Sequence, residues 1–143
     1  MEAAVEQPDP FVEHTYARVV EAGPERAVVE QPPARALDNH LAVRHASALY
    51  AAAYEASRTL VLAAAAATGE RVTIAPRRSE LVYKAMPLGS IRSTATPAGP
   101  GWNTLAADLR GGAAVELATT VESTNEEGKA VVNVELSWRV EAS

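Results

Sequence analysis

The pattern of hydrophobic and polar residues divides the chain into one helical stretch and several strand-like stretches. The clearest strand is the last, where apolar and polar side chains alternate from Ala130 to Glu141. One face of this strand is therefore expected to be buried and the other to be wet. Near the start, two β-prone runs, Tyr16–Glu21 and Arg26–Gln31, stand on either side of a Gly-Pro turn signal. They predict a hairpin.

The spacing of apolar residues between these strands predicts a single long helix, from about Ala46 to Thr68 and ended by Gly69. Apolar residues recur there at steps of three and four, at Leu49, Ala53, Ala56, Leu60, Ala63 and Ala67. Eleven of the 22 residues from 46 to 67 are alanine, which favours helix strongly. Alanine also lets a neighbouring backbone approach closely, as a sheet that curls around a helix requires.

Strand-like sequence resumes after the helix. Further strands are expected over 71–86, with a kink near Pro76, and over 90–96, 114–123 and 130–141. A Gly- and Pro-rich insert over 97–112 contains Trp102 and one helical turn. The order β-β-α-β-β-β-β predicts an α+β fold, in which a curved antiparallel sheet of about six strands wraps one central helix. The unpaired edges of such a sheet favour a homodimer.

Composition narrows the class of protein. The length of 143 residues suits one domain, expected over 11–143 after a flexible tail over 1–10. A net charge of −5 without any basic block argues against a nucleic-acid partner. No segment approaches the ~18 consecutive apolar residues of a membrane span. The first ten residues also lack the features of a secretion signal, so we expect a cytoplasmic protein.

Metal and thiol chemistry are not expected. The chain contains no cysteine, which excludes disulfides and thiolate catalysis. Of its three histidines only His40 and His45 are close together, and no carboxylate joins them at a metal-ligand spacing. We therefore expect neither a metal nor another resident cofactor.

The start of the predicted helix is the best candidate for chemistry. Asn39 and His45 stand in the polar stretch that leads into it. A helix N-terminus presents free N–H groups and a partial positive charge. It can therefore hold a carbonyl oxygen that becomes negative during acyl transfer.

Three motifs in order resemble those of hotdog-fold acyl-CoA thioesterases, in particular the phenylacetyl-CoA thioesterase group. The first runs into the helix and consists of Asn39, His45, Ala46, Ser47, Leu49 and Tyr50. The second is the strand Leu81–Met86, which leads into the turn Pro87-Leu88-Gly89. The third is the final hairpin, from Glu122 to Trp138, with Gly128 and Lys129 after its turn. The similarity covers about residues 16–140.

This resemblance implies a hotdog fold and hydrolysis of acyl-CoA thioesters, with coenzyme A as part of the substrate. The helix acid of the family corresponds to Tyr54 here, and the only acid inside the helix is the next residue, Glu55. Glu55 would activate water or attack the thioester carbon. Asn39 and His45 would help at the thioester, and Ser79 would hold the water beside the helix acid of a partner subunit.

The same resemblance implies a set of substrate-binding residues. Backbone N–H groups near Ala46 and Ser47 would stabilise the oxyanion, although the family often carries glycine at both positions. Tyr54 would hydrogen-bond the acyl carbonyl. Arg77 and Lys84, together with Arg78, would meet the phosphates of coenzyme A, and Trp102 would line or cover the acyl pocket.

Most of these residues also have a purely structural interpretation. Glu55 would pair with Arg58 one helical turn on, and Asn39 would simply form a turn. Ser47 would cap the helix, while Trp102 would only anchor a long loop. Ser79 would be an ordinary polar strand residue, and the basic residues would blunt an exposed strand edge.

Three functions remain open at this point. The first is hydrolysis of acyl-CoA or acyl-carrier thioesters, and the second is a non-catalytic hotdog domain that binds acyl-CoA or another apolar ligand. The third, a hotdog dehydratase, would need an acid near Thr59, where the chain has none. Coenzyme A and a carrier protein both stay open as the thiol part of the substrate, as do a dimer and a tetramer as the assembly.

Overall fold

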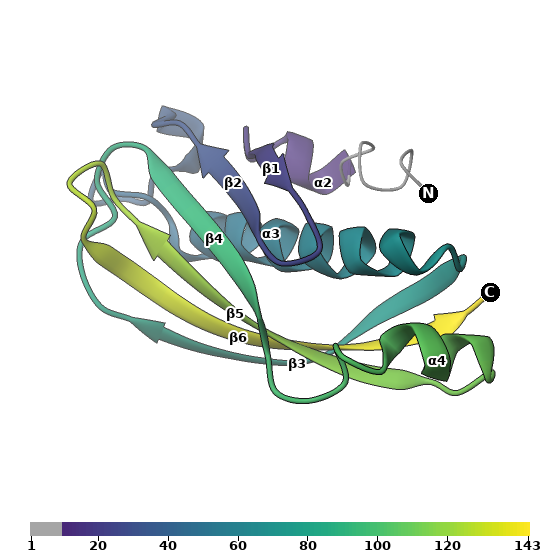
Figure 1. The fold of residues 1–143 in the computed structure, drawn as a ribbon. Helices are drawn as coiled ribbons and strands as arrows, with labels where there is room; N and C mark the ends of the chain where they lie inside the picture. Colours follow the sequence, from purple (N-terminus) through teal and green to yellow (C-terminus); the bar gives the residue numbers. More distant parts are fainter. Residues whose placement is uncertain (1–9) are drawn as a thin grey trace.

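The computed structural model, which describes residues 10–143, places one long helix against a six-stranded antiparallel sheet (Figure 1). The helix is α3 (Ala46–Thr68). The sheet contains, in the order β1-β2-β4-β5-β6-β3, the strands β1 (Arg18–Ala22), β2 (Ala27–Gln31), β4 (Ile91–Ala98), β5 (Val115–Thr124), β6 (Ala130–Ala142) and β3 (Val72–Tyr83). The predicted α+β fold, with a sheet wrapped around a single long helix, is confirmed.

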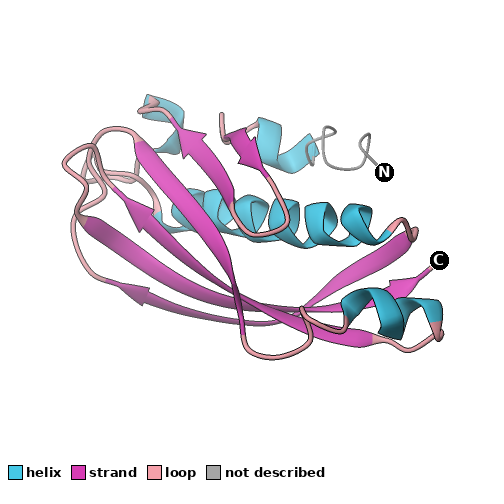
Figure 2. Ribbon diagram, viewed as in Figure 1, coloured by secondary structure: helices cyan, strands magenta, loops and turns pink. Residues whose placement is uncertain are grey.

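Within residues 10–143, three short helical segments lie outside α3 and the sheet (Figure 2). α2 (Pro10–Glu13) precedes the first hairpin, and a 3-10 turn, η1 (Arg35–Leu37), interrupts the connection to α3. Neither was expected from the sequence. α4 (Leu105–Arg110) is the helical turn predicted inside the 97–112 insert. The tail expected over 1–10 lies outside the described residues except for Pro10, which begins α2.

The ends of α3 follow from local chemistry. The backbone of Gly69 has a φ of 81°, in the left-handed region that favours glycine, and its N–H donates to Ala66 O. Half of the buried residues of the helix are alanines, namely Ala48, Ala51, Ala52, Ala53, Ala56, Ala64 and Ala65. Their small side chains let α3 pack closely against β2, β4 and β5.

The core has two parts along the helix. The first surrounds the amino-terminal half of α3, with Leu49, Leu60, Ile91, Val121 and Leu136 among its members. The second lies toward the other end, where Leu105 and Leu109 of α4 pack with Trp138 and Val61. Trp102, from the insert, packs against both parts.

A network of hydrogen bonds joins Trp138, Ser57 and Thr119 inside the core. The indole Nε1 of Trp138 donates to Ser57 Oγ at 2.8 Å, and Ser57 Oγ is 2.6 Å from Thr119 Oγ1. Thr119 Oγ1 also donates to Leu136 O at 3.3 Å. Because buried hydroxyl and indole groups are costly when unpaired, this network fixes the orientation of Trp138.

β3 forms one edge of the sheet and pairs only with β6. Its register shifts between Pro76 and Arg78, where the kink was predicted. Side chains on the inner face, toward α3, include Ser79, Leu81 and Tyr83, which lie opposite the buried Leu136, Val134 and Val132 of β6.

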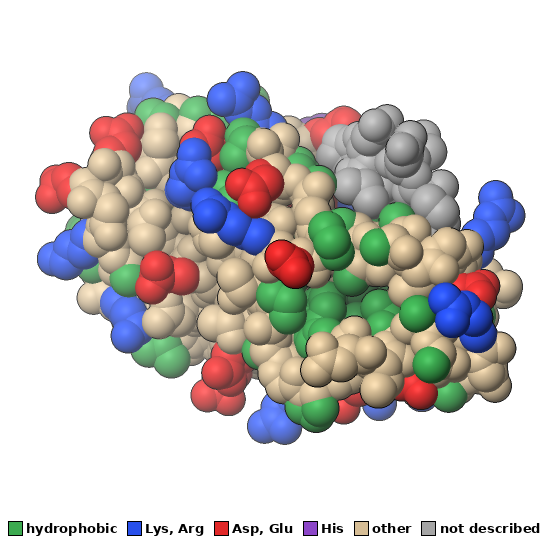
Figure 3. Space-filling model, in the orientation of Figure 1, with side chains coloured by type: hydrophobic (Ala, Val, Ile, Leu, Met, Phe, Trp, Pro, Cys, Tyr) green, Lys and Arg blue, Asp and Glu red, His purple; other side chains and the backbone are tan. Residues whose placement is uncertain are grey.

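Charges of both signs are scattered over the face in Figure 3, and hydrophobic side chains gather in one hollow right of centre. No block of positive charge appears on this face. Among residues 10–143, no helix combines the length and the apolar character that crossing a bilayer would need.

Candidate functional site

The loop before α3 is shaped by Asn39. Its side-chain Oδ1 accepts hydrogen bonds from the backbone N–H of Leu41 at 2.9 Å and of Val43 at 3.4 Å. The backbone N–H of Asn39 also donates to Val43 O. The amide oxygen of Asn39 therefore forms a turn of its own loop. A catalytic role for Asn39 stays a prediction.

A buried arginine ties this loop to two other segments. Arg44, only 3% exposed, donates from Nη1 to Gln31 Oε1 at 2.6 Å and from Nη2 to Gly89 O at 2.7 Å and Pro32 O at 3.2 Å. Gln31 Nε2 in turn donates to Ala48 O in the first turn of α3. Burial lowers the pKa of Arg44, and the nearby Asp38 carboxylate opposes this effect. We call Arg44 and Gln31 the arginine clasp.

His45 caps the helix. Its Nδ1 accepts the backbone N–H of Ser47 at 3.0 Å, and its carbonyl accepts the N–H groups of Ala48 and Leu49. The capping role considered for Ser47 therefore belongs to the His45 side chain. Both residues and Ala46 are exposed, so the start of α3 is open to solvent.

A cavity of about 600 Å³ lies beside this helix start. Three elements line it: α2 with Phe11 and Val12, the amino-terminal half of α3 with Ala46, Ser47, Tyr50, Ala51 and Tyr54, and the edge strand β3 with Leu81 and Tyr83. None of these side chains is acidic or basic. We call this cavity the helix-start pocket.

Hydroxyl groups supply the polar character of the pocket. The phenol oxygen of Tyr50 lies 2.6 Å from Ser79 Oγ, and either atom can donate. Ser79 thus faces the helix of its own subunit. When Ser79 donates, the hydroxyl hydrogen of Tyr50 can be given to a ligand oxygen.

Tyr54 and Glu55, the two candidates on the helix for the family's acid position, have different surroundings. Tyr54 lines the pocket, and its ring centroid is 6.1 Å from that of Tyr50 and 5.1 Å from that of Trp138. Glu55 is 1% exposed, and its Oε1 accepts from Arg58 Nη1 at 3.0 Å, which is the pairing considered from the sequence. Glu55 is not among the lining residues of the pocket.

The remaining candidates lie at different places. Arg77 stands at the β3 irregularity and lines a small hollow with Glu116 and Arg139. Lys84 is exposed and directly follows Tyr83 at the pocket. Trp102 donates from Nε1 to Ala98 O at 3.1 Å and to Ala118 O at 2.9 Å, which fixes the insert to the sheet. It does not line the helix-start pocket.

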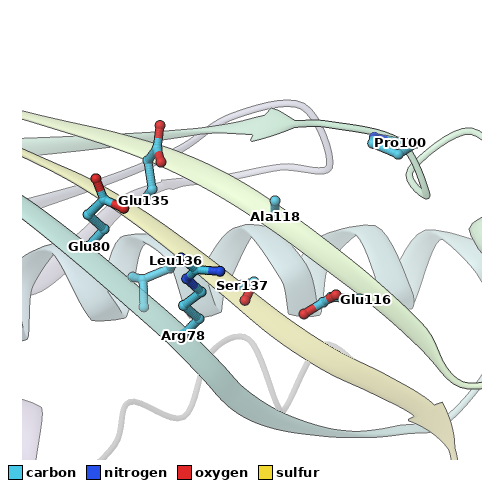
Figure 4. A pocket seen from close by; sticks show the side chains of 8 residues that line it. All are labelled: Arg78, Glu80, Pro100, Glu116, Ala118, Glu135, Leu136 and Ser137. Carbon is cyan, nitrogen blue, oxygen red and sulfur yellow. The ribbon is translucent and has the colours of Figure 1, made fainter.

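A second hollow, of about 490 Å³, lies on the outer face of the sheet (Figure 4). The side chains of Arg78, Glu80, Glu116, Glu135 and Ser137 surround it. Glu80 and Glu135 are direct neighbours on β3 and β6. This hollow is polar and lies away from the helix start, so it does not offer an apolar ligand the surface that the helix-start pocket does. Among residues 10–143, no group of three or more His, Asp or Glu is arranged to hold a metal ion.

Several pocket residues were missed in the sequence analysis. Phe11 and Val12 come from α2, whose four residues give no helical period to detect. Leu81 and Tyr83 share the inner face with Ser79, so the alternation of β3 contained a signal for them. Tyr50 stands four residues before Tyr54, which places both side chains on one face of α3.

Comparisons with known proteins agree on the fold. A family model described as "Domain of unknown function (DUF4442)" matches residues 1–140. A Pseudomonas aeruginosa protein, described as of unknown function and a probable thioesterase, has a TM-score of 0.79 and 20% identity. The match covers 99% of this chain and 93% of that one. No match was found among curated proteins.

Two further structures are described as thioesterases. The Haemophilus influenzae thioesterase has a TM-score of 0.73 and 16% identity, with 92% of this chain and 82% of that chain covered. A hypothetical thioesterase from Streptococcus pneumoniae, solved with coenzyme A, has a TM-score of 0.70 and 14% identity, with 89% and 87% covered. The predicted hotdog fold is confirmed, and proteins described as thioesterases share it.

Proposed function

We propose that this chain, which belongs to the DUF4442 family, binds an acyl thioester in the helix-start pocket and hydrolyses it to an acid and a thiol. The observation that carries this proposal is the position of the pocket. Apolar side chains of α2, α3 and β3 would enclose the acyl group. The exposed first turn of α3 stands at the same place.

The carbonyl oxygen of the thioester would lie at Ala46 and Ser47. The N-terminus of a long helix carries a partial positive charge that stabilises an oxyanion. The Ser47 N–H already donates to a neutral acceptor, His45 Nδ1, so a ligand oxygen would have to replace that acceptor. Tyr50, through its hydroxyl, would add a second donor.

Hydrolysis also needs a base, and Glu55 is the only carboxylate that α3 contains. Glu55 would take a proton from water as the water oxygen bonds to the carbonyl carbon. The C–S bond would then break, with the proton passing to the thiolate. Lys84, beside the pocket, is the basic residue placed best to meet a phosphate of coenzyme A.

We further propose that two copies associate through β3. This edge strand spans 12 residues, whereas β1 at the other edge spans five. Four exposed large hydrophobic side chains lie close together in the sequence at this edge. Val82 and Tyr83 end the strand, and Met86 and Leu88 come just after it. Because an open edge and exposed apolar side chains both favour pairing, a second copy would cover them and close the side of the pocket that β3 forms.

A non-catalytic role is the second candidate, and one observation favours it. Among residues 10–143, no acidic side chain lines the pocket, and the Glu55 carboxylate is held by Arg58. In this alternative the domain binds an acyl thioester and leaves it intact.

Release of free thiol from short, long and aromatic acyl-CoAs decides between the two candidates. We expect Glu55→Gln to abolish release while calorimetry still shows acyl-CoA binding and the melting temperature shows a folded protein. Glu70→Gln, which changes an acid just beyond the helix, is the matched control and should keep the turnover of the original chain. Unchanged turnover in Glu55→Gln would remove Glu55 from the mechanism. Binding without turnover in the original chain would establish the second candidate, and absence of binding would contradict both.

A further inference from the structure

Among the α3 residues that line the helix-start pocket, Tyr54 lies farthest from the helix start. It is the last residue of α3 in the lining, seven residues after Ser47, which is about 10 Å along the helix axis. Long side chains on a helix lean back toward its N-terminus. The phenol ring of Tyr54 is therefore directed over the preceding turn, toward Tyr50. An acyl group that extends from Ser47 along α3 would reach this ring.

The second part of the core begins behind this ring. Tyr54 packs against the second part of the core, as do the half-buried Val72 and Ile74 of β3. Its nearest aromatic neighbour there is Trp138, at a centroid distance of 5.1 Å. Tyr54 thus lies between the pocket and the second part of the core, and its ring would be the barrier that a long ligand meets.

The barrier has a fixed support. Trp138 is 1% exposed, and its indole nitrogen is held by Ser57, which is itself bonded to Thr119. The Tyr54 ring rests on this indole and cannot move inward without displacing a hydrogen-bonded side chain. A ligand that reaches the Tyr54 ring therefore meets a rigid surface.

We infer that Tyr54 sets the length of the acyl group that the pocket accepts, and that the preferred substrates carry short chains that end at its ring. This inference rests on the proposed function, because it names the class of acyl group for the same site. Each methylene that enters the apolar pocket should raise affinity about fourfold. The gain should stop once the chain reaches the ring.

The test is a series of saturated acyl-CoAs of increasing length, measured by calorimetry with the original chain and with Tyr54→Ala. In the original chain, affinity should rise with each methylene and then level off or fall at a defined length. We call the chain length at which affinity stops rising the break. Tyr54→Ala removes the ring and exposes Trp138 as the new end of the pocket, so the break should move to chains longer by about three methylenes. An unchanged break would overturn the inference.

Two variants serve as controls. Tyr54→Phe keeps the ring and should keep the break at its original length, and melting temperatures show whether each variant is folded. Tyr83→Ala removes a phenol from the β3 side of the same pocket. It should lower affinity at all lengths without moving the break. A break that shifts equally in Tyr83→Ala would show that no single residue sets it.

A parallel series of straight-chain alcohols separates this inference from the proposed function. Alcohols carry neither a thioester nor coenzyme A, so they report on the pocket alone. If alcohols bind with the expected break and acyl-CoAs do not bind, the length limit stands and the proposed function fails. If neither series binds, both are contradicted.

Discussion

The imidazole of His45 occupies the position that a short polar side chain takes at most helix starts. Here the ring nitrogen accepts the Ser47 N–H, one of the groups proposed to receive the thioester oxygen. Residue types and spacing could place Asn39, His45 and Ser47 around the first turn of α3. They could not tell which side chain would cap it, because that depends on the rotamer of His45 and on a loop shaped by Asn39 Oδ1.

We expect His45→Ala to lower the free energy of unfolding by about 1 kcal/mol, because the Ser47 N–H loses its acceptor. His45→Asn, which keeps a side-chain acceptor at the N-cap, should retain most of the stability. Urea unfolding of the three proteins measures both changes. Equal stability of the alanine and original proteins would show that the cap contributes nothing to the folded state.

Among the elements, α3 could be predicted almost completely, because its alanine content, its apolar period and Gly69 all indicate the same helix. The strands followed from alternation, and the kink of β3 from Pro76. α2 and η1 could not be predicted, since segments of four and three residues are too short to show a period. The pairing of Glu55 with Arg58 followed from their spacing. The burial of Glu55 and the contact of Tyr54 with Trp138 escaped prediction, because they depend on which strands pack on each side of the helix.

The C-terminus of α3 provides a test at this scale. Gly69 has a φ of 81° and open space where a Cβ would stand, so Gly69→Ala changes only the backbone energy. We expect a loss of about 1 kcal/mol in the free energy of unfolding. Gly111→Ala is the matched control, because Gly111 has an ordinary φ of −76° and ordinary contact distances around its Cβ. A similar loss in both variants would contradict this explanation.

For the whole molecule, the order of the elements predicted the architecture, and the helix-start pocket arises from that architecture. It needs α2, α3 and β3, which come from three separate parts of the chain. A sequence pattern describes one element at a time and does not measure the space between elements. For this reason the sequence predicted β3 as a strand but did not predict that its inner face lines a pocket.

The proposed association through β3 is tested by the mass of the protein in solution. We expect light scattering to give twice the mass of one chain, and Val82→Glu to shift the protein toward the single-chain mass by placing a charge on the exposed end of β3. Val20→Glu makes the same change on β1, the opposite edge, and should keep the higher mass. A reversed result would move the interface to β1, and a single-chain mass for the original protein would end the proposal.

The arginine clasp has a consequence for the affinity with which any ligand binds. Arg44 joins the end of β2, the segment before α3 and the turn around Gly89 through three hydrogen bonds within the protein. The loop at the beginning of the helix is thus preorganised, and a ligand need not spend binding energy on ordering it. Because the guanidinium group of Arg44 is shielded from water, the order that it gives this loop should persist in concentrated salt.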